Sequence, residues 1–155
     1  MSDRRRAAWV PLFVMMLTAC SDSPTDAGRL TIQAVAGVYG ASGAFGALTF
    51  TTVDSGNVTD LLDAGASISL RLNADGTTEG ELFIPGAGED GSDVDESLAG
   101  TWHLAGGTVT LEHDADTFLR EMQFTIVGGR LEGDRTFGQS ADGSGTRVRL
   151  TLQRQ

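Results

Sequence analysis

Apolar and polar residues alternate in short runs along most of the chain from Leu30 onward. A period of two is typical of β-strands with one buried face. Beyond the first 20 residues no stretch keeps the period of an amphipathic helix. The nearest, residues 59–65, predicts at most a single turn, with Thr59 as its cap and Gly65 closing it. Because glycine-containing turns separate the short runs, the pattern predicts an all-β domain.

The first clear hairpin joins residues 67–73 to residues 77–84. A two-residue Asp75-Gly76 turn would place Leu70 opposite Glu81 and so put a charge on the apolar face. A three-residue turn, with Gly76 left-handed in a bulge, keeps the apolar residues on one face, and we prefer it. The pairs it predicts are Leu72 with Thr78, Leu70 with Gly80 and Ile68 with Leu82.

Two further hairpins turn at double glycines, Gly106-Gly107 between residues 101–105 and 108–113, and Gly128-Gly129 between residues 118–127 and 130–137. Their predicted inward pairs are Leu104–Val109, Trp102–Leu111, Ile126–Leu131 and Phe124–Gly133. Runs over residues 32–39, 47–53 and 146–153 bring the total to about nine strands. Consecutive hairpins with one apolar face each must bury that face together. We therefore predict a small antiparallel up-and-down β-barrel of about 8–10 strands.

The first 20 residues have a different pattern. Arg4, Arg5 and Arg6 precede an apolar run over residues 7–17, which is too short to span a bilayer as a helix and is typical of a secretory signal. The run ends in Leu17-Thr18-Ala19-Cys20, which resembles the lipobox of bacterial lipoproteins. The resemblance implies attachment of a diacylglycerol to the Cys20 thiol, cleavage of the peptide bond before Cys20 and acylation of the new amino terminus, with fatty acids such as palmitate.

This resemblance predicts three parts: a signal peptide over residues 1–19, lipidated Cys20 with a polar tether to residue 29, and a barrel domain over residues 30–155. Two or more acyl chains hold a protein stably on a membrane. The sequence contains a single cysteine, which agrees with its use as the anchor. The residue after Cys20 is Ser21 rather than Asp. In this lipoprotein family that suggests sorting to the outer membrane, with the domain facing the periplasm.

Within the domain, Gly37-Val38-Tyr39 and Gly100-Thr101-Trp102 resemble the Gly-x-Trp strand starts of bacterial lipocalin-like proteins. The resemblance implies a calycin-type barrel, often with an apolar cavity, and it implies no catalytic residue. The side chains that would line such a cavity for a small apolar ligand are Tyr39, Phe50, Leu70, Trp102, Leu111 and Phe124. The alternative is plain core packing, because small barrels fill themselves with side chains.

The mature chain, residues 20–155, is strongly acidic. Removing Asp3 from the 21 acidic residues and Arg4–Arg6 from the 11 basic ones leaves 20 and 8, a net charge of −12. Such a surface repels nucleic acid and anionic lipid head groups, so we expect no nucleic-acid partner and no phosphate-binding role. An acidic run contains Glu89, Asp90, Asp93, Asp95 and Glu96. Calcium takes oxygen ligands of this kind, but the spacing is not that of an EF-hand, and a solvated loop is the alternative.

The two histidines of the chain do not indicate a metal site or a catalytic site. Strand alternation places His103 and His113 on opposite faces of their hairpin, so they cannot share a zinc ion. His113 lies beside Asp114 and Asp116, yet no nucleophile motif accompanies it, and we expect a polar loop there. We therefore predict no catalytic residue and no cofactor.

Together these features predict a non-enzymatic, lipid-anchored lipoprotein of the cell envelope. It would hold a small apolar ligand or present its acidic loops to another envelope protein. The alternative is a solid-core structural or inhibitory module that acts on an envelope partner such as a cell-wall hydrolase, by analogy alone.

Overall fold

A computed structural model describes residues 30–53, 55–88, 90–138 and 144–155. The predicted signal peptide, Cys20 and the tether lie outside the described residues. The regular secondary structure of the described part is almost all β-strand, with one short α-helix and one 3₁₀ helix. The helices are α1 (Ile32–Val35) and η1 (Phe118–Glu121). The strands are β1 (Gly37–Ser42), β2 (Ala47–Thr52), β3 (Val58–Asp60), β4 (Ser67–Leu72), β5 (Thr77–Ile84), β6 (Val94–Ser97), β7 (Gly100–Ala105), β8 (Thr108–His113), β9 (Gln123–Val127), β10 (Arg130–Phe137) and β11 (Thr146–Arg154).

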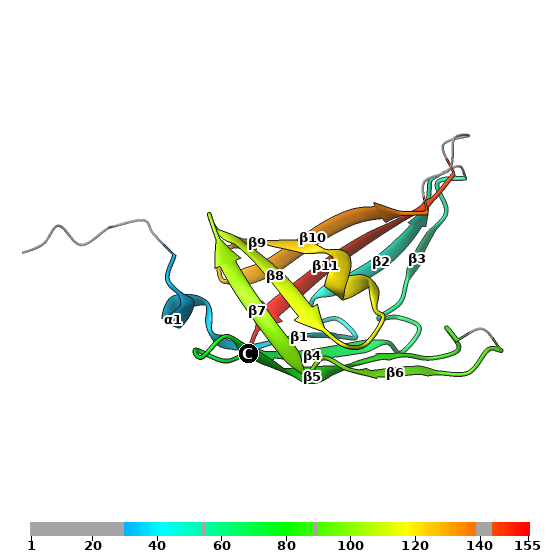
Figure 1. The fold of residues 1–155 in the computed structure, drawn as a ribbon. Coiled ribbons are helices and arrows are strands. Elements are labelled where there is room, and N and C mark those ends of the chain that lie inside the picture. Colours follow the sequence, from blue (N-terminus) through cyan, green and yellow to red (C-terminus); the bar gives the residue numbers. More distant parts are fainter. Residues whose placement is uncertain (1–29, 54, 89, 139–143) are drawn as a thin grey trace, which may run out of the picture.

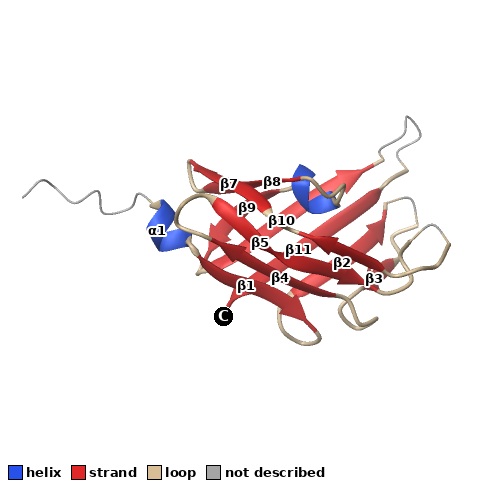
Figure 2. Ribbon diagram, turned by 60° about the horizontal axis from the view of Figure 1, so that its bottom comes forward, coloured by secondary structure: helices blue, strands red, loops and turns tan. Residues whose placement is uncertain are grey.

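Eight antiparallel strands close into a ring in the order β1-β4-β5-β7-β8-β9-β10-β11, with β11 pairing back to β1 (Figures 1 and 2). The closing seam joins Tyr39 to Arg154 and Gly40 to Gln153. Closure leaves no free edge around the ring. The predicted antiparallel up-and-down barrel is therefore confirmed, and it is compatible with the lipocalin-like barrel that the motifs imply.

The remaining strands continue strands of the ring. Tyr39 of β1 pairs with Leu70 of β4, and Phe50 of β2 pairs with Thr59 of β3. Phe50 lies eleven residues after Tyr39, and Thr59 lies eleven residues before Leu70. The register is therefore unbroken from β1–β4 into β2–β3. In the same way, β6 continues β7 along β5, since Glu81 pairs with Ser97 and Thr77 with Thr101. Towards the end opposite α1, these extensions form ribbons that diverge in Figure 1. We call this the ribbon end and the other the α1 end.

The three hairpins have the predicted registers. Every predicted inward pair is present: Leu72–Thr78, Leu70–Gly80, Ile68–Leu82, Leu104–Val109, Trp102–Leu111, Ile126–Leu131 and Phe124–Gly133. Gly76 has a φ of 88°, the left-handed conformation that the three-residue turn requires. Asp75 stabilises this turn by accepting hydrogen bonds from the backbone and hydroxyl of Thr77.

Two predicted strand segments are helical instead. Residues 32–35, predicted as the start of a strand, form α1, because the Thr31 hydroxyl accepts a hydrogen bond from the Ala34 amide and caps the turn. Residues 118–121, predicted as the start of a long strand, form η1, and β9 begins only at Gln123. Leu119 and Met122 lie three residues apart and are both buried, a spacing that suits a 3₁₀ turn.

The turn after β3 is also shifted from its prediction. Thr59 lies within β3, and Asp60 instead supplies the cap by accepting a hydrogen bond from the Leu62 amide at 2.9 Å. Gly65 closes the turn with a φ of 97°, as predicted. The chain then enters β4, and buried Leu62 and Ala66 join the core from this connection.

Candidate functional site

The barrel interior was predicted as a ligand cavity or a packed core, and the structure brings five of its six candidate residues into one cluster. Tyr39, Leu70, Trp102, Leu111 and Phe124 are each 0–2% exposed. Side chains that line a ligand-sized void keep surface accessible to water, and these five keep almost none. Phe50 is half-buried and packs its ring edge-to-face against Phe118, with 5.7 Å between centroids. The interior around the five residues is therefore a filled core.

Polar tips of the core aromatics reach main-chain partners at the α1 end. The Tyr39 hydroxyl donates to the Val35 carbonyl at 2.6 Å, and the Trp102 indole donates to the Asn73 carbonyl at 2.8 Å. Burial raises the pKa of Tyr39, and the charge of Arg154 opposes this shift. Arg154 lies over the Tyr39 ring and donates to the carbonyls of Ala34 and Ala36 at 3.0 and 2.6 Å. These bonds hold α1 across the end of the barrel.

The two histidines lie on opposite faces, as predicted. The side chain of His103 is 63% exposed, whereas His113 is 6% exposed and makes a 2.7 Å hydrogen bond with the Thr117 hydroxyl. Burial is the main cause that lowers the pKa of His113; nearby Arg120 adds to the shift and Asp114 opposes it. Because Thr117 is also buried, this pair fastens the loop before η1 and offers no accessible base to a substrate.

The acidic run does not bring its described carboxylates together. Asp90, Asp93, Asp95 and Glu96 are exposed, and Glu89 lies outside the described residues. Asp93 accepts a hydrogen bond from the Gly86 amide across the loop, while Asp95 and Glu96 are neighbours on β6 and point to opposite faces. Within the described ranges, no three His, Cys, Asp or Glu side chains are placed to hold a metal ion. Calcium binding stays a prediction, tested by whether millimolar calcium raises the melting temperature.

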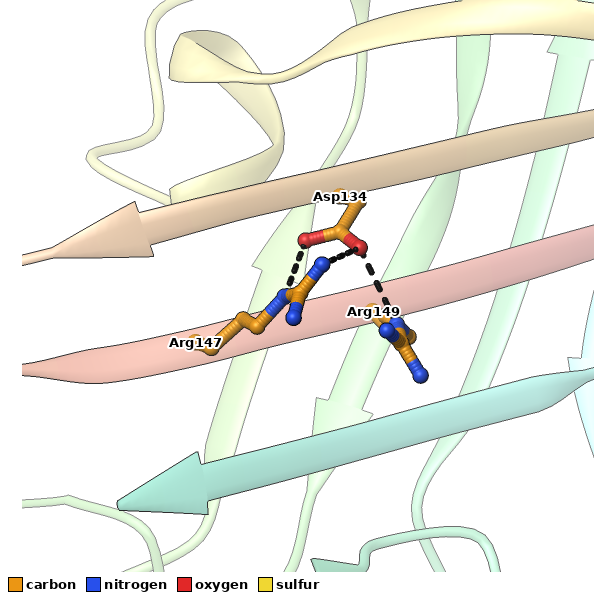
Figure 3. Close-up of polar contacts among 3 residues, drawn as sticks. All are labelled: Asp134, Arg147 and Arg149. Atoms are coloured by element: carbon orange, nitrogen blue, oxygen red, sulfur yellow. Dashed lines mark hydrogen bonds and ion pairs between the residues drawn. The ribbon is translucent and has the colours of Figure 1, made fainter. Parts of the chain in front are cut away.

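The outer face has a polar groove that the sequence did not predict. It has a volume of about 530 Å³ and lies across β8 to β11, lined by Thr108, Gln123, Thr125, Val127, Glu132, Gly133, Asp134, Arg149, Leu150 and Thr151. At one side, Asp134 accepts two hydrogen bonds from Arg147, at 2.7 and 2.6 Å, and one from Arg149 at 3.0 Å (Figure 3). These bonds, above all those from Arg147, lower the pKa of Asp134. Both arginines lie on the polar side of the alternating run over residues 146–153, and this alternation is the signal for their outward position.

A second hollow, of about 430 Å³, lies at the α1 end. Its lining comprises Arg130, Gln153, Arg154 and the turn glycines Gly128 and Gly129. Arg130 forms an ion pair with Glu132 at 3.2 Å. Arg154 makes its hydrogen bonds to neutral carbonyls, and no carboxylate of the described residues forms an ion pair with it. The lining of the hollow therefore combines two arginines with a glutamine and a double-glycine turn.

Comparison with known proteins gives no identification. No protein-family model matches the sequence, and neither a curated protein nor a solved structure matches it significantly. Across the described part of the chain, every helix is too short or too polar to cross a membrane.

Proposed function

We propose that the chain is an exported, lipid-anchored accessory protein of a bacterial cell envelope, which acts without catalysis by presenting the outside of its barrel to a partner protein. The observation that supports this most strongly is the filled core. With Tyr39, Leu70 and Phe124 at 0–1% exposure, the interior offers little room for a ligand, so binding falls to the outer surface. Of the two predicted functions, this favours the solid-core module.

The surface best suited to a partner is the acidic ribbon, which we define as the exposed carboxylates Glu79, Glu81, Asp90, Asp93, Asp95 and Glu96 on β5, β6 and their connection. Among the described residues, only Glu79 of this set forms an ion pair, with Arg71 at 3.9 Å. The other carboxylates remain available to a basic partner. A concentrated negative surface also accelerates encounter with such a partner, and salt weakens this effect.

Pull-down from detergent-solubilised envelopes, with the full chain as bait, tests the proposal. We expect a basic partner that is captured at low salt and lost at high salt. A Glu81→Gln/Asp95→Asn variant should capture less of it, because both carboxylates lie on the outer face of the ribbon.

The matched control is Glu121→Gln/Asp116→Asn, which removes the same charge beside η1, away from the acidic ribbon. Equal capture by wild type and both variants, or the absence of any salt-sensitive partner, would contradict the proposal. Flotation of wild type with membranes and its loss in Cys20→Ala tests the anchor separately.

A further inference from the structure

The hollow at the α1 end of this acidic protein has two arginines in its lining. Arg130 and Arg154 line it together with Gln153 and the Gly128-Gly129 turn. Arginine guanidinium groups match the geometry of phosphate oxygens, and neighbouring amide donors add to such a site. The charge of Arg154 is not neutralised by any described carboxylate, because its bonds go to backbone carbonyls. The hollow is thus suited to one phosphate group.

Exposed apolar side chains surround this end. Leu30 is 44% exposed, Ile32 39% and Val127 41%, and they are three of the six large apolar residues that are exposed in the described part of the chain. The Leu30 side chain lies beside Gly107 of the β7–β8 turn, Ile32 begins α1, and Val127 precedes the β9–β10 turn. Apolar side chains beside arginines are typical of a surface that rests at a membrane interface.

The chain also leads from this end towards the predicted anchor. Nine residues lie between Cys20 and Leu30, and the ten Cα–Cα steps of this segment can span at most about 35 Å when fully extended. Arg154 holds α1 through Ala34 and Ala36, so the point at which the chain leaves the barrel is fixed. The acidic ribbon continues to the opposite, ribbon end, away from an anionic bilayer (Figure 1).

We propose that the α1 end rests on the membrane, with the phosphate of a lipid head group in the Arg130–Arg154 hollow and Leu30, Ile32 and Val127 in the interface. This inference rests on the lipid anchor of the proposed function and adds to it a fixed orientation. The anchor would hold the barrel upright and direct the acidic ribbon away from the bilayer.

Fluorophores at two exposed valines test the orientation in the full lipidated chain. Val127→Cys places a label at the α1 end, and Val58→Cys places a matched label on β3 at the ribbon end, where Val58 is 65% exposed. Acylation of Cys20 leaves each introduced cysteine as the sole thiol for labelling. In vesicles containing anionic lipid and a head-group quencher, we expect strong quenching at position 127 and little at position 58.

Arg130→Gln tests the phosphate site, with Arg120→Gln beside η1 as the control, since each arginine forms one ion pair with a carboxylate. Loss of one arginine near an anionic surface should lower, about fivefold, the ratio of barrels whose α1 end contacts the membrane to barrels that hang free on the tether. This change would be seen as weaker quenching at position 127. Arg120→Gln should leave quenching unchanged. Arg154 is left intact because it also holds α1.

The outcomes separate the two proposals. A chain that does not float with vesicles lacks the anchor, and the proposed function fails together with the orientation. A chain that floats but is quenched equally at both positions keeps its anchor and overturns the orientation. If inorganic phosphate stabilises wild type against heat but quenching at position 127 is unaffected by Arg130→Gln, the hollow is a site for free phosphate and the membrane contact is overturned.

Discussion

Two glycines that begin similar motifs meet different surroundings. A Cβ on Gly100 would lie 2.1 Å from the Glu112 carbonyl oxygen and 2.8 Å from the His113 Cα, both fixed by the β7–β8 pairing. A Cβ on Gly37 would instead meet the Arg154 guanidinium at 2.9 Å. Backbone of a paired strand cannot move aside, whereas the end of a long side chain can. The two Gly-x-aromatic motifs are therefore unequal in their need for glycine.

We expect Gly100→Ala to lower the free energy of unfolding by about 1–3 kcal/mol, the usual cost of forcing extra volume into a packed site. Gly37→Ala should cost less, because Arg154 can shift. Urea denaturation followed by the fluorescence of buried Trp102 measures both variants. A larger loss in Gly37→Ala would show that the Arg154 contacts matter more than the β7–β8 spacing.

His113 makes stability depend on pH. Because burial lowers its pKa in the folded protein, the unfolded chain binds the proton more readily. Stability should therefore fall as the pH drops below about 6.5, until the folded-state pKa is reached. His113→Gln should flatten this part of the profile. Chemical denaturation at a series of pH values checks this, and identical profiles for wild type and His113→Gln would contradict it.

Strand alternation was enough to place the two histidines on opposite faces of their hairpin, but not to predict the contacts of Arg154. The two-residue period of β11 places Arg154 on the same face as buried Leu150 and Leu152, and the sequence pattern gives no reason for a charged residue on that face. Its partners Ala34 and Ala36 are backbone carbonyls more than a hundred positions earlier in the chain. Carbonyl acceptors have no sequence signature, so this contact could be found only once the ring was closed.

At the scale of elements, the hairpins were predictable because a short turn and a two-residue period fix their register locally. α1 and η1 were not, because short apolar segments fit a strand and a helical turn equally well. The continuations β3 and β6 were missed for a similar reason. Each is short, lies beside polar residues, and takes its register from the longer strand that it extends.

The link between β10 and β11 gives a prediction at this scale. Asp134 bonds two arginines of β11, and its side chain is 40% exposed, so solvent keeps the interaction weak. Asp134→Asn should lower the free energy of unfolding by up to about 1 kcal/mol, and less at high salt. Because the pKa of Asp134 is lowered in the folded protein, its carboxylate stabilises the fold at pH values above the unfolded-state pKa near 3.8. This stabilisation is lost as the pH falls through the folded-state pKa of Asp134.

Denaturation at two salt concentrations measures the effect of Asp134→Asn. Asp116→Asn is the control, because Asp116 is 92% exposed and meets a single arginine on its own loop. We expect it to leave stability almost unchanged. An equal loss in the two variants would mean that sharing one carboxylate between Arg147 and Arg149 adds nothing to the β10–β11 pairing.

At the scale of the whole molecule, closure could be predicted because open apolar hairpins have unprotected edges. Whether the ring holds a ligand could not, because the same apolar residues serve a cavity or a core. The answer depends on how side chains from different strands interdigitate. Trp102 and Phe124 come from different strands, and both are 2% exposed or less.

The filled interior predicts that the protein carries no small molecule when purified. Native mass spectrometry of the chain from residue 21, prepared from the periplasm without detergent, should give the mass of the polypeptide alone. A stoichiometric added mass in the range of a lipid would support the apolar cavity instead, and a mass increase of one calcium ion would point to the acidic run. Trp102→Ala, which empties part of the core, is the positive control for ligand uptake.

The seam between β1 and β11 has a consequence for biogenesis. Its two strands lie near opposite ends of the described chain, so the ring cannot close until β11 has been synthesised. Until then β1 and β10 each present an unpaired edge, the kind of surface on which nascent chains aggregate. A chain truncated before β11 should therefore form no smaller barrel and should remain an open sheet that is prone to aggregate.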